Sequence, residues 1–143
     1  MADPKTAGTI RCVIVTPETT GLDTHCKSVS LPLFDGGRGV ARGHAPFNGR
    51  LGAGEVRVAG EQGGAADAGR SVFVEGGFVE VSHDTVTVIT QRAIPADKID
   101  AAAARAELGK VTATKATGDE ALAAKLKAAE AARALVRAAT RGR

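Results

Sequence analysis

A chain of 143 residues is long enough for one ordinary domain, or for a small domain with an appendage. Its aromatic residues are four phenylalanines, with no tyrosine or tryptophan, which argues against the stacking platform of single-strand nucleic-acid binders. The net charge of +3 is modest but uneven: residues 1–96 hold nine basic and ten acidic side chains, and residues 97–143 hold ten and six.

The two cysteines, Cys12 and Cys26, lie 14 residues apart, which suits neither a CxxC metal site nor a disulfide framework. We expect both to be reduced thiols of the cytosolic type. No apolar run approaches the roughly 20 residues that a membrane helix needs, and the first ten residues, MADPKTAGTI, lack the apolar core of a signal peptide. We therefore expect no direct membrane insertion, whereas peripheral attachment to a membrane stays open.

From residue 9 to residue 90 the apolar residues recur at every second position, which is the period of half-buried strands. The candidate strands are IRCVIV (10–15), VSLPL (29–33), EVRV (55–58), SVFVEGGFVEV (71–81) and DTVTVIT (84–90). The fourth of these predicts two short strands that meet at Gly76 and Gly77. Glycine-rich runs at 35–39 and 59–69 predict turns. Many short strands with such turns are typical of an antiparallel sandwich or barrel.

The pattern changes to a helical one after Pro95. Asp97 is the expected N-cap of an alanine-rich helix that ends near Gly109. Thr117 and Glu120 have the spacing of a capping box for a second helix, which continues to about residue 139. An apolar stripe at three- and four-residue spacing follows this helix: Leu122, Leu126, Ala129, Ala132 and Val136.

The two helices, joined by a short polar loop, predict an antiparallel hairpin. Its apolar faces are mostly methyl groups, so we expect loose packing that a partner can redistribute between conformations. The predicted fold class is therefore β + α. An N-terminal antiparallel β-sandwich covers residues 1–94, and a C-terminal two-helix antiparallel hairpin covers residues 95–143.

His44, within GVARGHAPFNGRLG, is the first candidate for chemistry. A general base needs a nucleophile or an orienting carboxylate beside it, and a metal needs several ligands. The other two histidines stand on separate segments, and the sequence contains no HxH, HExxH or Cys-His cluster. We interpret His44 as a turn residue, since Pro46 fixes its own φ and pushes Ala45 toward extended geometry. We predict no catalytic residue and no metal site.

The glycine-rich runs do not form a phosphate-binding loop or a dinucleotide fingerprint. No GKS or GKT follows them, and no strand-to-helix transition surrounds them. The chain also lacks a GxSxG motif and a pair of acidic residues in a site context. We therefore expect that the protein is not an enzyme and needs no cofactor.

The basic excess is concentrated at the C-terminal end, where residues 125–143 carry six basic side chains and one acidic one. Such a stretch is either a solvated helix face or a cationic surface for an acidic helix, a nucleic acid or an anionic membrane. The candidate residues are Lys125, Lys127, Arg133, Arg137 and Arg141.

Several short motifs stand in a characteristic order between about residues 9 and 140. They are VTPE (15–18), GGRGV (36–40), GHAP (43–46), EGGFVEVSHDTVTVIT (75–90), AI (93–94) and ID (99–100) at the start of the helical tail. The ordered set resembles the epsilon subunit of bacterial F-type ATP synthases, whose mitochondrial counterpart is called delta. The resemblance implies a β-sandwich of ten strands followed by a helical hairpin.

In function, the resemblance implies a non-catalytic subunit of the rotating central stalk, which couples proton translocation through the c-subunit ring to ATP synthesis. The β-sandwich would bind the gamma subunit and rest on the c ring. The C-terminal helices would fold up or extend along gamma, where the basic residues meet an acidic segment of the beta subunit, beside alpha, and inhibit ATP hydrolysis. The implied location is peripheral, on the cytoplasmic face of the bacterial plasma membrane.

The resemblance also carries over to a loop that faces the c ring. The candidate residues are Gly37, Arg38, Arg42, Gly43, His44, Ala45 and Pro46. The family often has an acidic residue at the position of Gly37, two before the glycine that matches Gly39. Because this chain carries Arg38 and Arg42 instead, an acid-dependent contact is either absent or has changed partner.

Some members of the family bind regulatory ATP through the pattern Ile or Leu, Asp, two variable residues, Arg, Ala. Ile99 and Asp100 match its first two positions and Ala104 matches its last, but Ala103 occupies the arginine position. Arg105 lies about 200° further round a helix and cannot simply substitute. We therefore expect weak or absent ATP binding.

Two other classes of function stay open. A small β-domain protein that binds nucleic acid through a basic helical tail predicts salt-dependent binding of DNA or RNA. A sandwich that binds a small ligand or carbohydrate, or an enzyme centred on His44, needs a concave site with converging polar groups.

Overall fold

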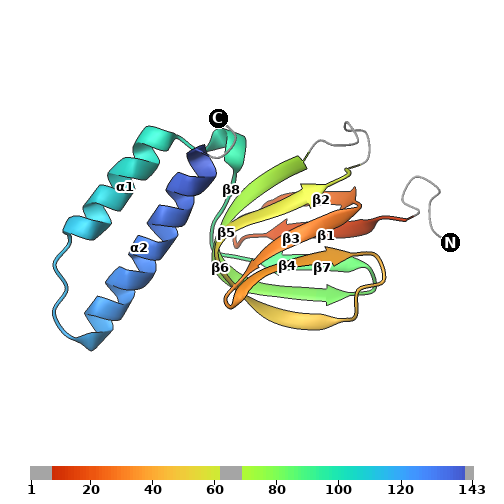
Figure 1. Cartoon of the computed structure of the whole chain (residues 1–143), viewed down its shortest axis with the longest axis horizontal. Helices are drawn as coiled ribbons and strands as arrows, with labels where there is room; N and C mark the ends of the chain where they lie inside the picture. Colours follow the sequence, from red (N-terminus) through yellow and green to blue (C-terminus); the bar gives the residue numbers. More distant parts are fainter. Residues whose placement is uncertain (1–7, 62–68, 141–143) are drawn as a thin grey trace. The chain divides into compact units, whose positions relative to one another are not determined.

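A computed structural model describes residues 8–61 and 69–140 of the chain (Figure 1). The chain divides after Pro95 into two compact units. Most of the glycine-rich run at 59–69 and the candidate Arg141 lie outside the described residues. The first unit contains the strands β1 (Ile10–Val15), β2 (Thr20–Cys26), β3 (Ser28–Leu33), β4 (Gly36–Ala41), β5 (Phe47–Ala59), β6 (Gly69–Ser82), β7 (Thr85–Ile89) and β8 (Ala93–Pro95).

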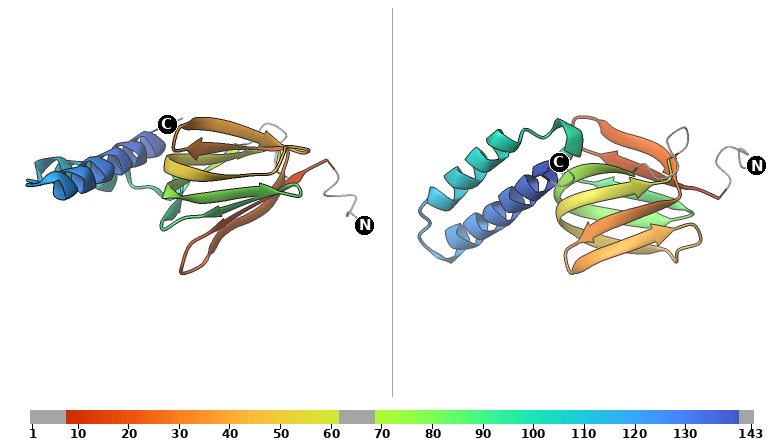
Figure 2. Two further views of the ribbon diagram at one scale, coloured as in Figure 1. Left: turned by 90° about the horizontal axis from the view of Figure 1, so that it is seen from below. Right: turned by 45° about the horizontal axis from the view of Figure 1, so that its top comes forward.

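One continuous sheet, in the order β2-β1-β7-β6-β5-β3-β4, folds over on itself to make the predicted β-sandwich. The long strands β5 and β6, of 13 and 14 residues, curl as they cross the fold (Figures 1 and 2). The first part of β6 pairs with β8 and its last part pairs with β7, so β6 serves both layers.

The described residues contain eight strands rather than the ten that the resemblance implies. The segment 71–81, expected to be two strands, lies within the single strand β6, and most of the run 35–39, expected to be a turn, lies in strand β4. The predicted antiparallel sandwich contains one parallel pair, β1 with β7. These two strands are far apart in sequence, so no hairpin turn imposes an antiparallel direction on them.

The alternation predicted for β1 is confirmed, since Ile10, Cys12 and Ile14 are buried and Arg11 is exposed. Residues of every strand from β1 to β7 meet in one hydrophobic cluster, and Leu51 is one of those that β5 contributes. Cys12 and Cys26 are free thiols with no exposed surface. Burial raises the pKa of Cys12 to about 12 and that of Cys26 to about 11, so both thiols stay protonated near neutral pH.

The bend in β6 depends on Gly77. Its φ of +108° lies in a region that residues with a side chain rarely adopt. A Cβ at this position would overlap the carbonyl group of Ile89 and lie 3.0 Å from Thr90 Cα. Only glycine lets the backbone of β6 pass this close to the end of β7.

The second unit consists of the 3₁₀ turn η2 (Ala96–Lys98) and the helices α1 (Ala101–Ala113) and α2 (Asp119–Thr140), which lie side by side (Figure 1). The N-cap of α1 is Asp100 and not the predicted Asp97, because the chain makes the 3₁₀ turn first. Asp100 Oδ1 accepts hydrogen bonds from the backbone N–H groups of Ala102 (2.9 Å) and Ala103 (3.1 Å).

Both helix boundaries between α1 and α2 differ from those predicted. α1 continues four residues past Gly109, since a single glycine in a helix costs only about 1 kcal/mol relative to alanine. α2 begins at Asp119, directly after Gly118, whose φ is +91°. The residue directly before the helix is therefore Gly118, and not the predicted Thr117.

The apolar stripe predicted for α2 is wrong in its first half, where Leu122 and Leu126 are 48% and 60% exposed. The stripe becomes buried only at its third and fourth members, Ala129 and Ala132. The buried residues lie in the second half of the helix: Ala129, Ala131, Ala132, Ala134, Leu135, Ala138 and Ala139.

Replacement of Gly77 by alanine is expected to destabilise the β-sandwich by at least about 3 kcal/mol, because the new Cβ must displace Ile89 and strain the backbone. Urea unfolding of the full-length chain measures the loss. Gly39→Ala is the matched control, since a Cβ at Gly39 meets nothing within 4 Å. Equal midpoints for the two variants would contradict the role of Gly77.

The buried thiols make stability depend on alkaline pH. An unfolded thiol loses its proton near pH 9.0, whereas native Cys12 and Cys26 keep theirs until about pH 12 and 11. The native state therefore binds more protons, and the free energy of unfolding falls as pH rises above about 9, by about 1.4 kcal/mol per pH unit per thiol. Urea unfolding under reducing conditions at successive pH values should show a shallower decline for Cys12→Ala/Cys26→Ala. Identical slopes would count against it.

Candidate functional site

The loop of residues 42–46 connects β4 to β5 and contains the GHAP motif. The backbone N–H of His44 donates to Ala41 O at 3.1 Å, and Gly43 has a φ of +82°. His44 Nδ1 lies 2.8 Å from Ala45 O, an acceptor that requires the proton on that ring nitrogen. The half-buried His44 thus acts as a turn residue whose ring is held by its neighbour's backbone.

The β6–β7 turn holds this loop in place through Asp84. His83 and Asp84 both have φ near +55°, as in the two-residue hairpin turns that follow the twist of the strands. Asp84 Oδ1 accepts a hydrogen bond of 2.8 Å from the Gly43 N–H, and Oδ2 lies 3.9 Å from Arg42 Nε. The carbonyl of Asp84 accepts from the Arg11 N–H at 2.9 Å. Asp84 therefore ties the loop to β1 and to the β6–β7 hairpin.

Sequence reasoning did not identify Asp84 as part of the site. The available signal was the dipeptide His83-Asp84 between two β-branched strands, which indicates a tight turn. Nothing in the sequence indicates that this turn lies beside residues 42–43, which are about 40 positions earlier.

Two arginines beside the loop stack on phenylalanine rings. The guanidinium carbon of Arg38, on β4, lies 4.9 Å from the centroid of the Phe47 ring. The ring of His44 lies 5.2 Å from the same centroid, tilted by 55°. The guanidinium carbon of Arg50, on β5, lies 4.8 Å from the centroid of Phe34. Cation–π contacts of this kind fix the direction of otherwise flexible side chains.

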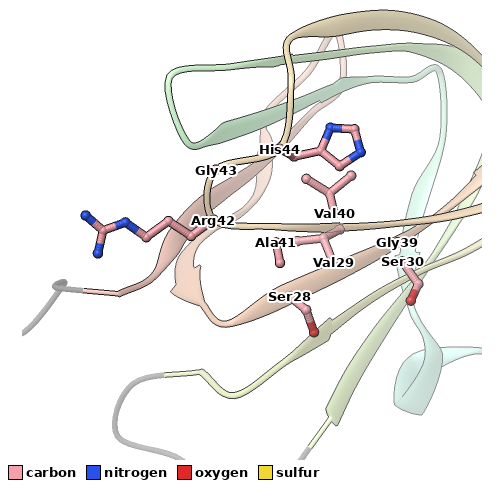
Figure 3. A pocket seen from close by; sticks show the side chains of 9 residues that line it. All are labelled: Ser28, Val29, Ser30, Gly39, Val40, Ala41, Arg42, Gly43 and His44. Carbon is pink, nitrogen blue, oxygen red and sulfur yellow. The ribbon is translucent and has the colours of Figure 1, made fainter.

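Two shallow hollows flank β4. The first, of about 470 Å³, is lined by parts of β3 and β4 and by residues 42–44 (Figure 3). Figure 3 shows the Arg42 side chain pointing away from the other lining side chains. The second hollow, of about 370 Å³, is lined by Arg38, Phe47, Arg50, Phe34 and Asp35, among others. The two stacked arginines thus line one hollow.

The structure brings four of the seven loop candidates together in two pairs. Arg38 and His44 both lie against the ring of Phe47, and Arg42 and Gly43 meet at Asp84. The remaining candidates, Gly37, Ala45 and Pro46, are exposed. All lie on β4 or in the β4–β5 loop, which form one continuous segment of the chain.

The residues of the degenerate ATP motif do not converge on a site. Ile99 and Ala104 are buried, Ala103 is exposed, and the Asp100 carboxylate is engaged as the N-cap of α1. Arg105 is exposed. Both capping hydrogen bonds go to Asp100 Oδ1, which fixes this carboxylate at the start of the helix.

Of the basic candidates on α2, Lys127, Arg133 and Arg137 are exposed and Lys125 is half-buried. None of these four forms an ion pair within the described part of the chain. Over residues 8–61 and 69–140, no three His, Cys, Asp or Glu side chains lie together as metal ligands could. Neither described helix has the length and hydropathy of a membrane span.

Comparison with known proteins agrees with this organisation. The family model described as "ATP synthase, Delta/Epsilon chain, beta-sandwich domain" matches residues 9–96. An ATP synthase epsilon chain from Rhodopirellula baltica is 50% identical over 91 residues, which are 64% of this chain and 67% of the relative. An ATP synthase epsilon chain from a Synechococcus species is 39% identical over 137 residues, 94% of this chain and 96% of the relative.

A solved structure shares the fold of both units. A chain in the cryo-EM structure of the Euglena gracilis mitochondrial ATP synthase superposes with a TM-score of 0.76 at 19% identity, covering 94% of this chain and 84% of that chain. The family match spans more than half of the sequence, and the Synechococcus relative spans nearly all of it. The chain therefore belongs to the delta/epsilon chain family of ATP synthase subunits.

Proposed function

We propose that this ATP synthase epsilon chain, a non-catalytic part of the central stalk, rests on the c-subunit ring through its β4–β5 loop. The proposal rests on the contacts of the Asp84 carboxylate with Gly43 and Arg42, which hold an exposed loop containing glycine and proline in one conformation. A preformed loop binds with less loss of conformational entropy than a flexible one. A loop that transmits rotation to and from the c ring also needs to be rigid.

The gamma subunit would bind the outer face of the sandwich. Phe78 and Ile89 are register partners on β6 and β7, and they are 64% and 57% exposed. Two large apolar side chains side by side on a sheet face are typical of a protein interface. Contact with gamma here and with the c ring at the loop would couple proton translocation to ATP synthesis.

The C-terminal helices would supply inhibition of ATP hydrolysis. Lys127, Arg133 and Arg137 are exposed and free of ion pairs in the described part of the chain, so their charge is available to an acidic segment of the beta subunit, beside alpha. The exposed Leu122 and Leu126 on the same helix offer apolar contact.

The proposed location is peripheral, on the cytoplasmic face of the bacterial plasma membrane. Partners are gamma, the c ring, beta and alpha, and the proposal includes neither nucleic acid nor a cofactor. With Asp100 engaged as the N-cap of α1 and alanine at position 103, ATP binding by this chain would be weak or absent.

Asp84→Ala is expected to weaken binding of the rotor to c rings by about five- to tenfold, because Gly43 and Arg42 lose the carboxylate that orders the loop. The measurement is binding of F1 containing this chain to vesicles with purified c rings. Asp84→Asn is the matched control, since its amide oxygen can still accept from Gly43, and it should retain most of the affinity. Unchanged binding by Asp84→Ala would contradict the proposed contact between the β4–β5 loop and the c ring.

Deletion of residues 97–143 should raise ATP hydrolysis by the reconstituted complex, because it removes the basic helices. Arg133→Gln/Arg137→Gln in the full-length chain should give a smaller rise in the same direction. Ala123→Gln, also at an exposed position on α2, changes no charge, serves as the control and should leave hydrolysis at the wild-type rate. Equal rates for the deleted and full-length chains would exclude an inhibitory role.

A further inference from the structure

Arg38 and Arg50 are two fixed cations without a carboxylate partner. They line the same hollow of about 370 Å³ from neighbouring parts of β4 and β5. Neither forms an ion pair with any residue that the structure describes. The other arginines of the described sandwich, by contrast, all pair with carboxylates: Arg11, Arg42, Arg57, Arg70 and Arg92.

Stacking on a ring prepares a guanidinium for recognition of an anion. Phe47 and Phe34 cover one face of Arg38 and Arg50 at 4.9 and 4.8 Å. Neither guanidinium donates a hydrogen bond to another residue that the structure describes, so its N–H groups are free for a carboxylate, which can accept two parallel hydrogen bonds.

We propose that Arg38 and Arg50 form a carboxylate-binding site, and that its occupant is an acidic side chain on the loop of the c subunit that meets this chain. The inference rests on the proposed function, since the hollow adjoins His44 through Phe47. It assigns the charges of the contact: the cations lie on this chain, and the carboxylate lies on the ring.

The composition of the hollow favours a single carboxylate over a phosphate group. Asp35 lines the same hollow as the two arginines. Its negative charge opposes a second anion, and it opposes a doubly charged phosphate more strongly than a singly charged carboxylate. The net charge of the three groups is +1, which one carboxylate neutralises.

The test measures binding of F1 containing the full-length chain to vesicles with purified c rings, over a range of salt concentrations. Arg38→Gln/Arg50→Gln should weaken binding at low salt by about tenfold or more and flatten its salt dependence. Arg38→Lys/Arg50→Lys should fall between the two, because lysine keeps the charge but loses the planar N–H edge. Arg57→Gln, outside the hollow and paired with Glu55, is the control and should bind like wild type.

A double-mutant cycle identifies the partner group. Conversion of the c-loop carboxylate to its amide should weaken wild-type binding as much as the arginine changes do, with little further loss when both are combined. Additive losses, or a c loop without any acidic residue, would overturn the assignment. So would binding of wild-type F1 to anionic vesicles without c rings, or competition by millimolar inorganic phosphate, which point to a lipid headgroup or free phosphate.

The proposal and the function on which it rests fail in different ways. If Asp84→Ala weakens binding to c rings but Arg38→Gln/Arg50→Gln does not, the proposed carboxylate site is wrong, whereas the proposed contact of the β4–β5 loop with the c ring is supported. If neither change affects binding, both are wrong. Thermal unfolding of each variant checks that the sandwich remains folded.

Discussion

The close approach of Gly77 to the end of β7 is the constraint on which the rest of the β-sandwich depends. It allows β6 to bend and pair with β8 in its first part and with β7 in its last part. A side chain here would push β6 away from the end of β7, because the overlap is with backbone that cannot rotate away. The bend brings the β6–β7 turn, and with it Asp84, to the end of the sandwich where residues 42–44 lie.

Because of the same bend, Asp84 can hold the β4–β5 loop in one conformation. Glycine and proline alone give the β4–β5 loop a range of shapes, and the Asp84 carboxylate selects one of them by holding the Gly43 N–H. On the neighbouring face, Phe47 is packed against the core and supports both Arg38 and His44. Arg38 is thereby positioned by the half-buried Phe47, whereas Arg50 lies on the exposed ring of Phe34.

Prediction from sequence was most successful where one local period dominates. The alternation of Ile10, Cys12 and Ile14 placed β1 correctly, and the alanine-rich stretches placed both helices within a few residues. Prediction was wrong at the start of α1 and along the first half of α2. The helix start moved from Asp97 to Asp100 because a 3₁₀ turn comes first, and Leu122 and Leu126 are exposed although they continue the apolar stripe of α2.

The sequence by itself determined the β + α order, the alternation of β1 and the position of the GHAP loop, because these follow from short-range periodicity and from motifs along the chain. Only the tertiary structure decided that β1 runs parallel to β7, that Asp84 holds Gly43 and Arg42, and that Arg38 and Arg50 share a hollow. Each of these joins residues separated by at least a dozen positions. Such pairs are fixed by how the strands pack, and no local pattern records them.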